Sequence, residues 1–167
     1  MAEGARREVL ILEHDPKEHA GTIREFLERE EIPHRRVLLH EGAELPEPAS
    51  ARCVVAMGGP MNVYEEEKFP FLRREDAFLR ALVKEGVPFL GICLGSQLLA
   101  KALDAKVYRA QTAEVGWDDV RLLSAVRKDP LFKGLEPGPL RVFQWHQDTF
   151  DLPAGAAHLA SSALVAH

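Results

Sequence analysis

The chain has 167 residues, a net charge of −5, 46% hydrophobic residues and 28% charged residues. This length and composition predict one globular domain, residues 1–167, with a sizeable core. The acidic balance argues against nucleic acid or an anionic membrane surface as a partner. No apolar run reaches the length of a membrane-spanning helix, and the charged N-terminus lacks a signal-peptide pattern. We therefore expect a cytoplasmic protein with no membrane partner.

The two cysteines, Cys53 and Cys93, are far apart in the chain, and neither has a neighbour at metal-ligand spacing. A disulfide framework is therefore not expected, and a reducing compartment suits a reactive thiol. We expect neither a metal site nor a cofactor.

Short apolar runs alternate with helical patterns over the first two thirds of the chain. Strands are expected at 9–12, 36–39, 53–57 and in the apolar segment leading to Gly91, and helices at 16–32, 70–85 and 94–103. Parallel strands covered by helices on both faces follow from this alternation. The fold class is therefore α/β, with a doubly wound, mostly parallel, flavodoxin-like sheet. Ligands of such sheets bind beyond the carboxyl ends of the strands.

The first of these helices has a predicted start and a predicted inner face. Asp15 is expected as its N-cap, with Pro16 at the first helical position. Ile23, Phe26 and Leu27 are expected to face the core.

After Lys106 the pattern changes to strands separated by turns. Strands are expected at 107–108, 115–123 and 140–145, ending with 159–162. This part of the chain is expected to be more antiparallel.

The segment 87–100 is the most informative part of the chain. An apolar strand leads into the turn Gly91-Ile92-Cys93-Leu94-Gly95, and a helix follows at once. This is the nucleophile-elbow pattern, with cysteine where the α/β-hydrolases have serine. Small residues at 91 and 95 allow a sharp turn, and a helix N-terminus stabilises a thiolate. The alternative is a buried structural cysteine, but the flanking glycines and Gln97 favour a nucleophile.

Two further features lie where this chemistry needs them. Gly58-Gly59-Pro60 follows a predicted strand, so the N–H of Gly59 is a candidate to form an oxyanion hole with the N–H of Leu94. The alternative is a simple turn. Gln97, one turn into the helix, is a candidate to bind a polar substrate, and the alternative is an exposed helix residue.

Histidine is the usual partner of a catalytic cysteine. His146 ends a predicted strand and is the candidate in this chain. Five others are interpreted as loop or polar-face residues without a role: His14, His19, His34, His40 and His158.

Together these motifs resemble the class I (triad-type) glutamine amidotransferases, in the branch similar to the glutaminase domain of guanosine monophosphate synthase. The resemblance rests on residues 58–61, 91–97, 114–117, 146–153 and 159–162. It implies that Cys93 attacks the side-chain amide of L-glutamine, or of another γ-glutamyl compound, and that ammonia leaves from a thioester. Gly59 and Leu94 would stabilise the oxyanion. Gly58, Gln97, His146 and Asp148 would lie at the substrate pocket.

The chain departs from the family in one respect. The family's catalytic histidine and glutamate lie in a His-Pro-Glu-like motif near the C-terminus, and this chain has no His-x-Glu downstream of Cys93. The expectation is a domain truncated at its C-terminus, without the final strand and helix, and with impaired hydrolysis. Three explanations are open: a truncated product, a pseudoenzyme or partial domain completed by a partner or second copy, or His146 or His167 acting as base.

The function classes that remain are an amidotransferase, alone or with a synthetase partner, and a non-catalytic regulatory or binding domain. A third class, the cysteine-elbow superfamily of deglycases and intracellular peptidases, is disfavoured because Leu94, not histidine, follows Cys93. A missing sheet strand would leave an apolar edge exposed, which favours a homodimer.

Overall fold

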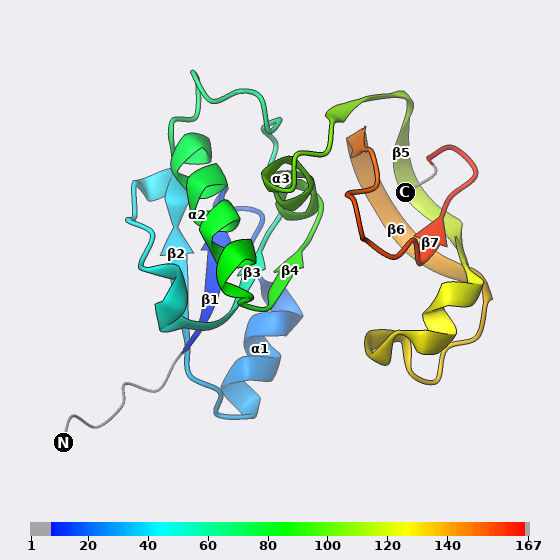
Figure 1. Cartoon of the computed structure of the whole chain (residues 1–167), viewed down its shortest axis with the longest axis horizontal. Helices are drawn as coiled ribbons and strands as arrows, with labels where there is room; N and C mark the ends of the chain where they lie inside the picture. The colour runs from blue at the N-terminus through cyan, green and yellow to red at the C-terminus, as the bar shows by residue number, and fades with distance from the viewer. Residues whose placement is uncertain (1–7, 166–167) are drawn as a thin grey trace. The chain divides into compact units, whose positions relative to one another are not determined.

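The structure, a computed structural model, describes residues 8–165. The chain divides into two compact units, Met1–Ala102 and Leu103–His167 (Figure 1). In the first unit the elements are, in chain order, β1 (Glu8–Glu13), α1 (Gly21–Arg29), β2 (His34–Leu38), the 3₁₀ turns η1 (Leu39–Glu41) and η2 (Pro48–Ser50), β3 (Ala51–Ala56), α2 (Phe71–Glu85), β4 (Phe89–Gly91) and α3 (Leu94–Ala102).

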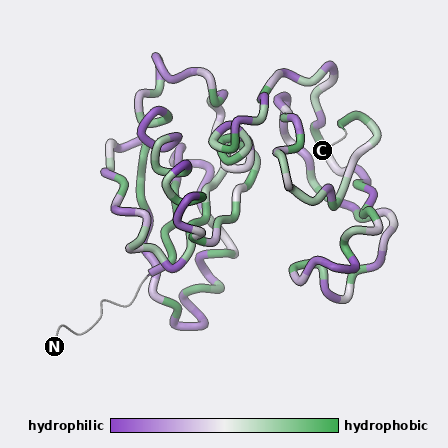
Figure 2. Tube along the Cα trace, in the orientation of Figure 1, coloured by the Kyte–Doolittle hydropathy of each residue, from purple (hydrophilic) through white to green (hydrophobic). Residues whose placement is uncertain are grey.

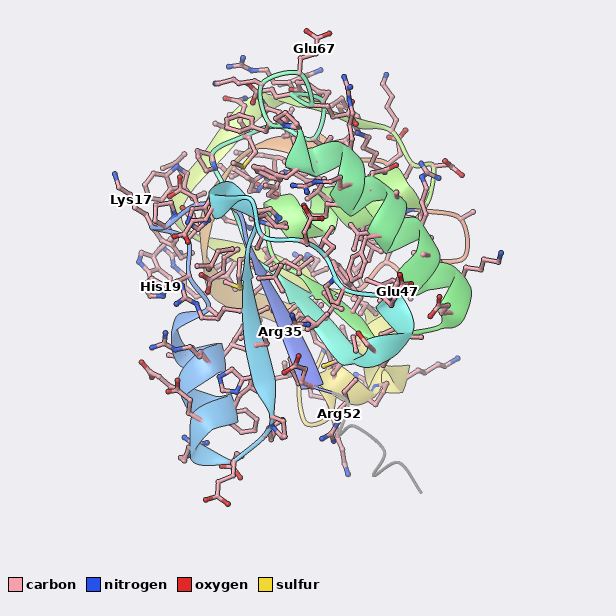
Figure 3. The ribbon with its side chains drawn as sticks, turned by 90° about the vertical axis from the view of Figure 1, so that its left-hand side faces the viewer. Lys17, His19, Arg35, Glu47, Arg52 and Glu67 are labelled. Atoms are coloured by element: carbon pink, nitrogen blue, oxygen red, sulfur yellow. The ribbon has the colours of Figure 1, made fainter. Side chains whose placement is uncertain are left out.

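The first unit is built on a parallel sheet with the strand order β2-β1-β3-β4. Alternate residues of β1 point to opposite faces, and residues 9–13 are all buried, as in a sheet covered on both sides. Figure 3 shows α1 and α2 on opposite sides of the strands. The expected α/β fold with a doubly wound, mostly parallel sheet is confirmed.

Helix α1 begins later than expected. It starts at Gly21, and the Asp15 carboxylate accepts a hydrogen bond from the backbone N–H of Lys17 at 2.9 Å. Asp15 therefore closes a local turn rather than capping a helix. The chain between β1 and α1 consequently forms a loop at the carboxyl end of the sheet.

The inner face of α1 also differs from the expectation at one residue. Leu27 is buried and Ile23 packs against the same core, but Phe26 is 47% exposed. The buried stripe runs through positions 20, 23 and 27, which leaves Phe26 at its border. There the Arg29 guanidinium lies 5.3 Å from the centre of its ring.

Helix α2 presents the expected apolar stripe to the core. Its buried apolar residues are Phe71, Leu72, Phe78, Leu79 and Leu82. A charged residue, Glu75, is buried within the same stripe, whereas Val83 is exposed. In Figure 2, α1 and α2 alternate between polar and apolar residues, and α3 is more continuously hydrophobic.

The second unit is antiparallel, as expected. It contains β5 (Val107–Leu122), η3 (Ser124–Lys128), η4 (Pro130–Phe132), β6 (Gly138–Phe150) and β7 (Ala160–Ser161), with the strand order β6-β5-β7. The two strands expected at 107–108 and 115–123 are one long strand, because pairing with β6 continues across an irregularity between Arg109 and Glu114. Within residues 8–165 no helix is long and apolar enough to cross a membrane.

Candidate active site

Three residues occupy equivalent positions beyond the carboxyl ends of neighbouring strands. The parallel register aligns the end of β1 with the end of β3, and the end of β3 with the end of β4. His14, Gly58 and Cys93 each come two residues after the aligned positions. The sheet therefore brings these three residues to one edge, where α/β folds bind their ligands.

Cys93 has the strained backbone of a nucleophile elbow. Its φ is +51°, a left-handed conformation that non-glycine residues rarely adopt. A Cβ on Gly91 would lie 2.6 Å from the backbone of Gly95 and Ser96, and a Cβ on Gly95 would lie 2.3 Å from the carbonyl oxygen of Ala56. Both glycines are therefore required by close backbone approach, as the sequence pattern predicts.

The surroundings of Cys93 favour the thiol over the thiolate. Partial desolvation of the sulfur raises its pKa even though the Cys93 residue is exposed, and the Glu18 carboxylate raises that pKa further. The N–H of Leu94, at the start of α3, acts in the opposite direction but does not outweigh them. The helix N-terminus thus stabilises the thiolate as expected, through the N–H of Leu94, while the net effect of all these groups is a raised pKa of Cys93.

The glycine pair after β3 packs against the elbow. A Cβ on Gly58 would lie 3.7 Å from the Cβ of Cys93, and a Cβ on Gly59 would lie 2.9 Å from the Cδ2 of Leu94. The glycine pair and the elbow are therefore in contact at this edge of the sheet.

Gln97 is buried, at 7% exposure, on the first turn of α3. Its backbone N–H donates to the Cys93 carbonyl at 3.2 Å, which places the residue one turn beyond the elbow. The alternative interpretation, an exposed helix residue, is wrong.

The candidates His146 and Asp148 belong to the second unit. His146 Nε2 lies 2.9 Å from a carboxylate oxygen of Glu114, its partner across the β5–β6 ladder. His146 Nδ1 lies 3.1 Å from the backbone carbonyl of Asp148, and the Asp148 side chain is buried. Both ring nitrogens of His146 therefore have partners within the second unit. His167, the other candidate base, lies outside the described residues.

A comparison of the sequence with models of known protein families shows which family the chain belongs to. The model described as "Glutamine amidotransferase class-I" matches residues 35–164, most of the chain. The chain belongs to this family. Within it, the chain is similar to the "GMP synthase [glutamine-hydrolyzing]" of Thermus thermophilus, with 38% identity over 102 residues, which are 61% of this chain and 18% of the relative. For the enzyme of that name from Staphylococcus saprophyticus the identity is 37% over 110 residues, 65% of this chain and 19% of the relative. These matches therefore span only about a fifth of the curated relatives.

Two solved glutamine amidotransferase structures share the fold over nearly the whole chain. A glutamine amidotransferase from Thermotoga maritima is 38% identical with a TM-score of 0.88, covering 97% of this chain and 70% of that one. A glutamine amido transferase from Methylobacillus flagellatus is 30% identical, also with a TM-score of 0.88, covering 97% and 64%.

The structure also brings to this edge of the sheet residues that the sequence pattern does not single out. His14, which follows β1, is buried, and its ring contacts both Glu75 and the carbonyl of Gly58. Lys17 and His19, from the same loop, point outward in Figure 3. Two signals mark the buried pair: His14 directly follows a buried strand, and Glu75 interrupts the apolar stripe of α2.

The third missed residue is Glu18. A Cβ on Gly58 would lie 3.2 Å from its carboxylate oxygen, so this acidic group reaches the same edge of the sheet as Cys93. Nothing in its exposed, polar sequence context distinguishes it from the other loop carboxylates.

Proposed function

We propose that this class I amidotransferase chain acts on L-glutamine through Cys93. The sulfur attacks the side-chain amide carbon, the amide nitrogen takes a proton and leaves as ammonia, and water then hydrolyses the γ-glutamyl thioester. The N–H groups of Gly59 and Leu94 stabilise the oxyanion, and Gln97 and Gly58 help to hold the substrate. The observation that carries this proposal is the strained Cys93 turn packed against the Gly58–Gly59 pair.

Within these 167 residues, removal of the proton from the Cys93 thiol limits the rate of this reaction. The pKa of Cys93 is raised, and no His-x-Glu follows Cys93 in the sequence. Loss of the base from a catalytic triad costs roughly 10⁴- to 10⁶-fold in kcat. We therefore propose slow hydrolysis by this chain alone, with the ammonia delivered to a synthetase partner, as the names of its GMP synthase relatives suggest. Cys53 and Cys93 are not joined in a disulfide, which fits a cytoplasmic location.

A non-catalytic binding domain is the second candidate. The observation that favours it is that both ring nitrogens of His146, the candidate base of the second unit, are held by Glu114 and by the backbone carbonyl of Asp148. Such a domain would keep the elbow as a scaffold and bind glutamine without hydrolysing it.

Ammonia release from L-glutamine by the purified chain separates the two functions. We expect slow turnover that disappears in Cys93→Ala, with intact mass confirmed in the same preparation. Glutamine binding, measured by calorimetry on both proteins, identifies a folded site. Binding without any Cys93-dependent ammonia would reject hydrolysis and favour the non-catalytic domain.

A further inference from the structure

The strongest unexplained feature of the first unit is a buried ion pair beside the elbow. Nε2 of His14 lies 2.9 and 3.0 Å from the two carboxylate oxygens of Glu75, and both side chains are fully shielded from solvent. The two residues come from the loop after β1 and from α2. A buried charged pair at a core position costs desolvation free energy that apolar residues would not, so stability alone gives a weak reason for it.

The hydrogen-bond partners of His14 determine where its protons lie. Nδ1 is 3.1 Å from the carbonyl oxygen of Gly58, which only accepts hydrogen bonds, so Nδ1 carries a proton. Nε2 faces the Glu75 carboxylate, so a second proton lies between these two groups. Although burial lowers the pKa of His14, the charge and hydrogen bonds of Glu75 outweigh it and raise that pKa overall.

This arrangement sets the orientation of the peptide between Gly58 and Gly59. In a trans peptide the C=O of one residue and the N–H of the next point in opposite directions, and the described chain has no cis peptide bond. With the Gly58 carbonyl held by His14, the N–H of Gly59 points away from His14. Two glycines restrict peptide rotation less than any other pair of residues, so this orientation depends on an outside contact.

We propose that His14, held by Glu75, is a positioning residue that fixes the Gly58–Gly59 peptide with its N–H available as an oxyanion donor. This inference rests on the proposed function, because that function assigns the donor role to Gly59. Without His14 the peptide is free to turn, and a carbonyl oxygen would then face the developing negative charge.

The test compares two reactions of Cys93. Acylation by p-nitrophenyl acetate passes through a tetrahedral oxyanion, whereas alkylation by iodoacetamide does not. In His14→Phe, which cannot donate a hydrogen bond, we expect acylation to fall roughly 10- to 100-fold while alkylation stays within about twofold. In His14→Asn, whose amide N–H can replace Nδ1–H, we expect acylation within about fivefold of the wild type.

Equal acylation by His14→Phe and the wild type would overturn the proposal, and so would equal losses in the Phe and Asn variants. If His14→Phe does not fold, ¹⁵N NMR of the wild-type imidazole decides instead: a protonated Nδ1 supports the hydrogen bond to Gly58, and an unprotonated Nδ1 overturns it. Neither reaction uses glutamine. A wild type that is acylated at Cys93 but releases no ammonia would thus reject the proposed hydrolysis and leave this inference standing.

Discussion

The acidity of Cys93 depends on a neighbour that a substitution can neutralise. The thiolate is the reactive form, so a raised pKa moves alkylation of Cys93 to higher pH than for a free cysteine. Glu18→Gln removes a negative charge that disfavours the thiolate and therefore lowers this pKa. We expect roughly threefold faster alkylation by iodoacetamide at neutral pH, since one pKa unit changes the thiolate fraction about tenfold.

Mass spectrometry of the Cys93 peptide, after alkylation at a series of pH values, gives the pH profile of Cys93 alkylation separately from that of Cys53. Asp15→Asn is the matched control, because its carboxylate lies in the same loop but is bonded to the N–H of Lys17. If the pH profile of Cys93 alkylation is unchanged in Glu18→Gln, or moves to higher pH, the Glu18 charge does not raise the pKa of Cys93 and the prediction is wrong.

The contact between α3 and β3 leaves no room for a side chain at Gly95. A Cβ there would lie 2.3 Å from the Ala56 carbonyl oxygen and 2.8 Å from the Ala56 Cβ. Gly95→Ala must push the helix off the strand, and overpacking of this kind costs about 1–3 kcal/mol of unfolding free energy. Better helix propensity returns about 1 kcal/mol of that cost, and because the clash is with the Ala56 backbone, which cannot rotate away, we expect a net loss of about 2 kcal/mol.

Urea unfolding followed by circular dichroism measures this loss. Ser96→Ala, in the same turn of α3, is the control and is expected to stay within about 0.5–1 kcal/mol of the wild type because its hydroxyl hydrogen bond is exposed. A Gly95→Ala variant as stable as the wild type would show that the helix does not pack on β3 this closely.

At the scale of the whole molecule, exposed aromatic side chains gather on the β5–β6 ladder. Trp117 pairs with Phe143 and Val115 with Trp145, and Trp145 is 73% exposed. The ring centres of Trp117 and Phe143 are 5.6 Å apart, and those of Phe143 and Trp145 are 6.3 Å apart. This face is the kind of apolar patch that binds hydrophobic dyes.

We expect a fluorescent hydrophobic dye to bind the native chain and to lose most of its signal with the double variant Trp117→Ser, Trp145→Ser. Leu131→Ser is the control, because Leu131 is exposed on η4, outside this ladder. Undiminished dye fluorescence with the double variant would place the apolar surface elsewhere. Light scattering on the same samples tests the expected homodimer.

The amino-acid sequence by itself determined the features that depend on near neighbours. Alternating apolar runs specified the parallel strands and their helices, and Gly91, Cys93 and Gly95 specified the elbow, because a tight turn needs small residues at set spacings. Only the tertiary structure decided which distant residues meet. His14 and Glu75 are 61 residues apart, and their pairing follows from the position of α2 beside the end of β1. Likewise, burial and the charge of Glu18 set the pKa of Cys93. Short-range sterics can be read from neighbouring residues, whereas burial and charge pairing arise only once the sheet register has brought separate segments together.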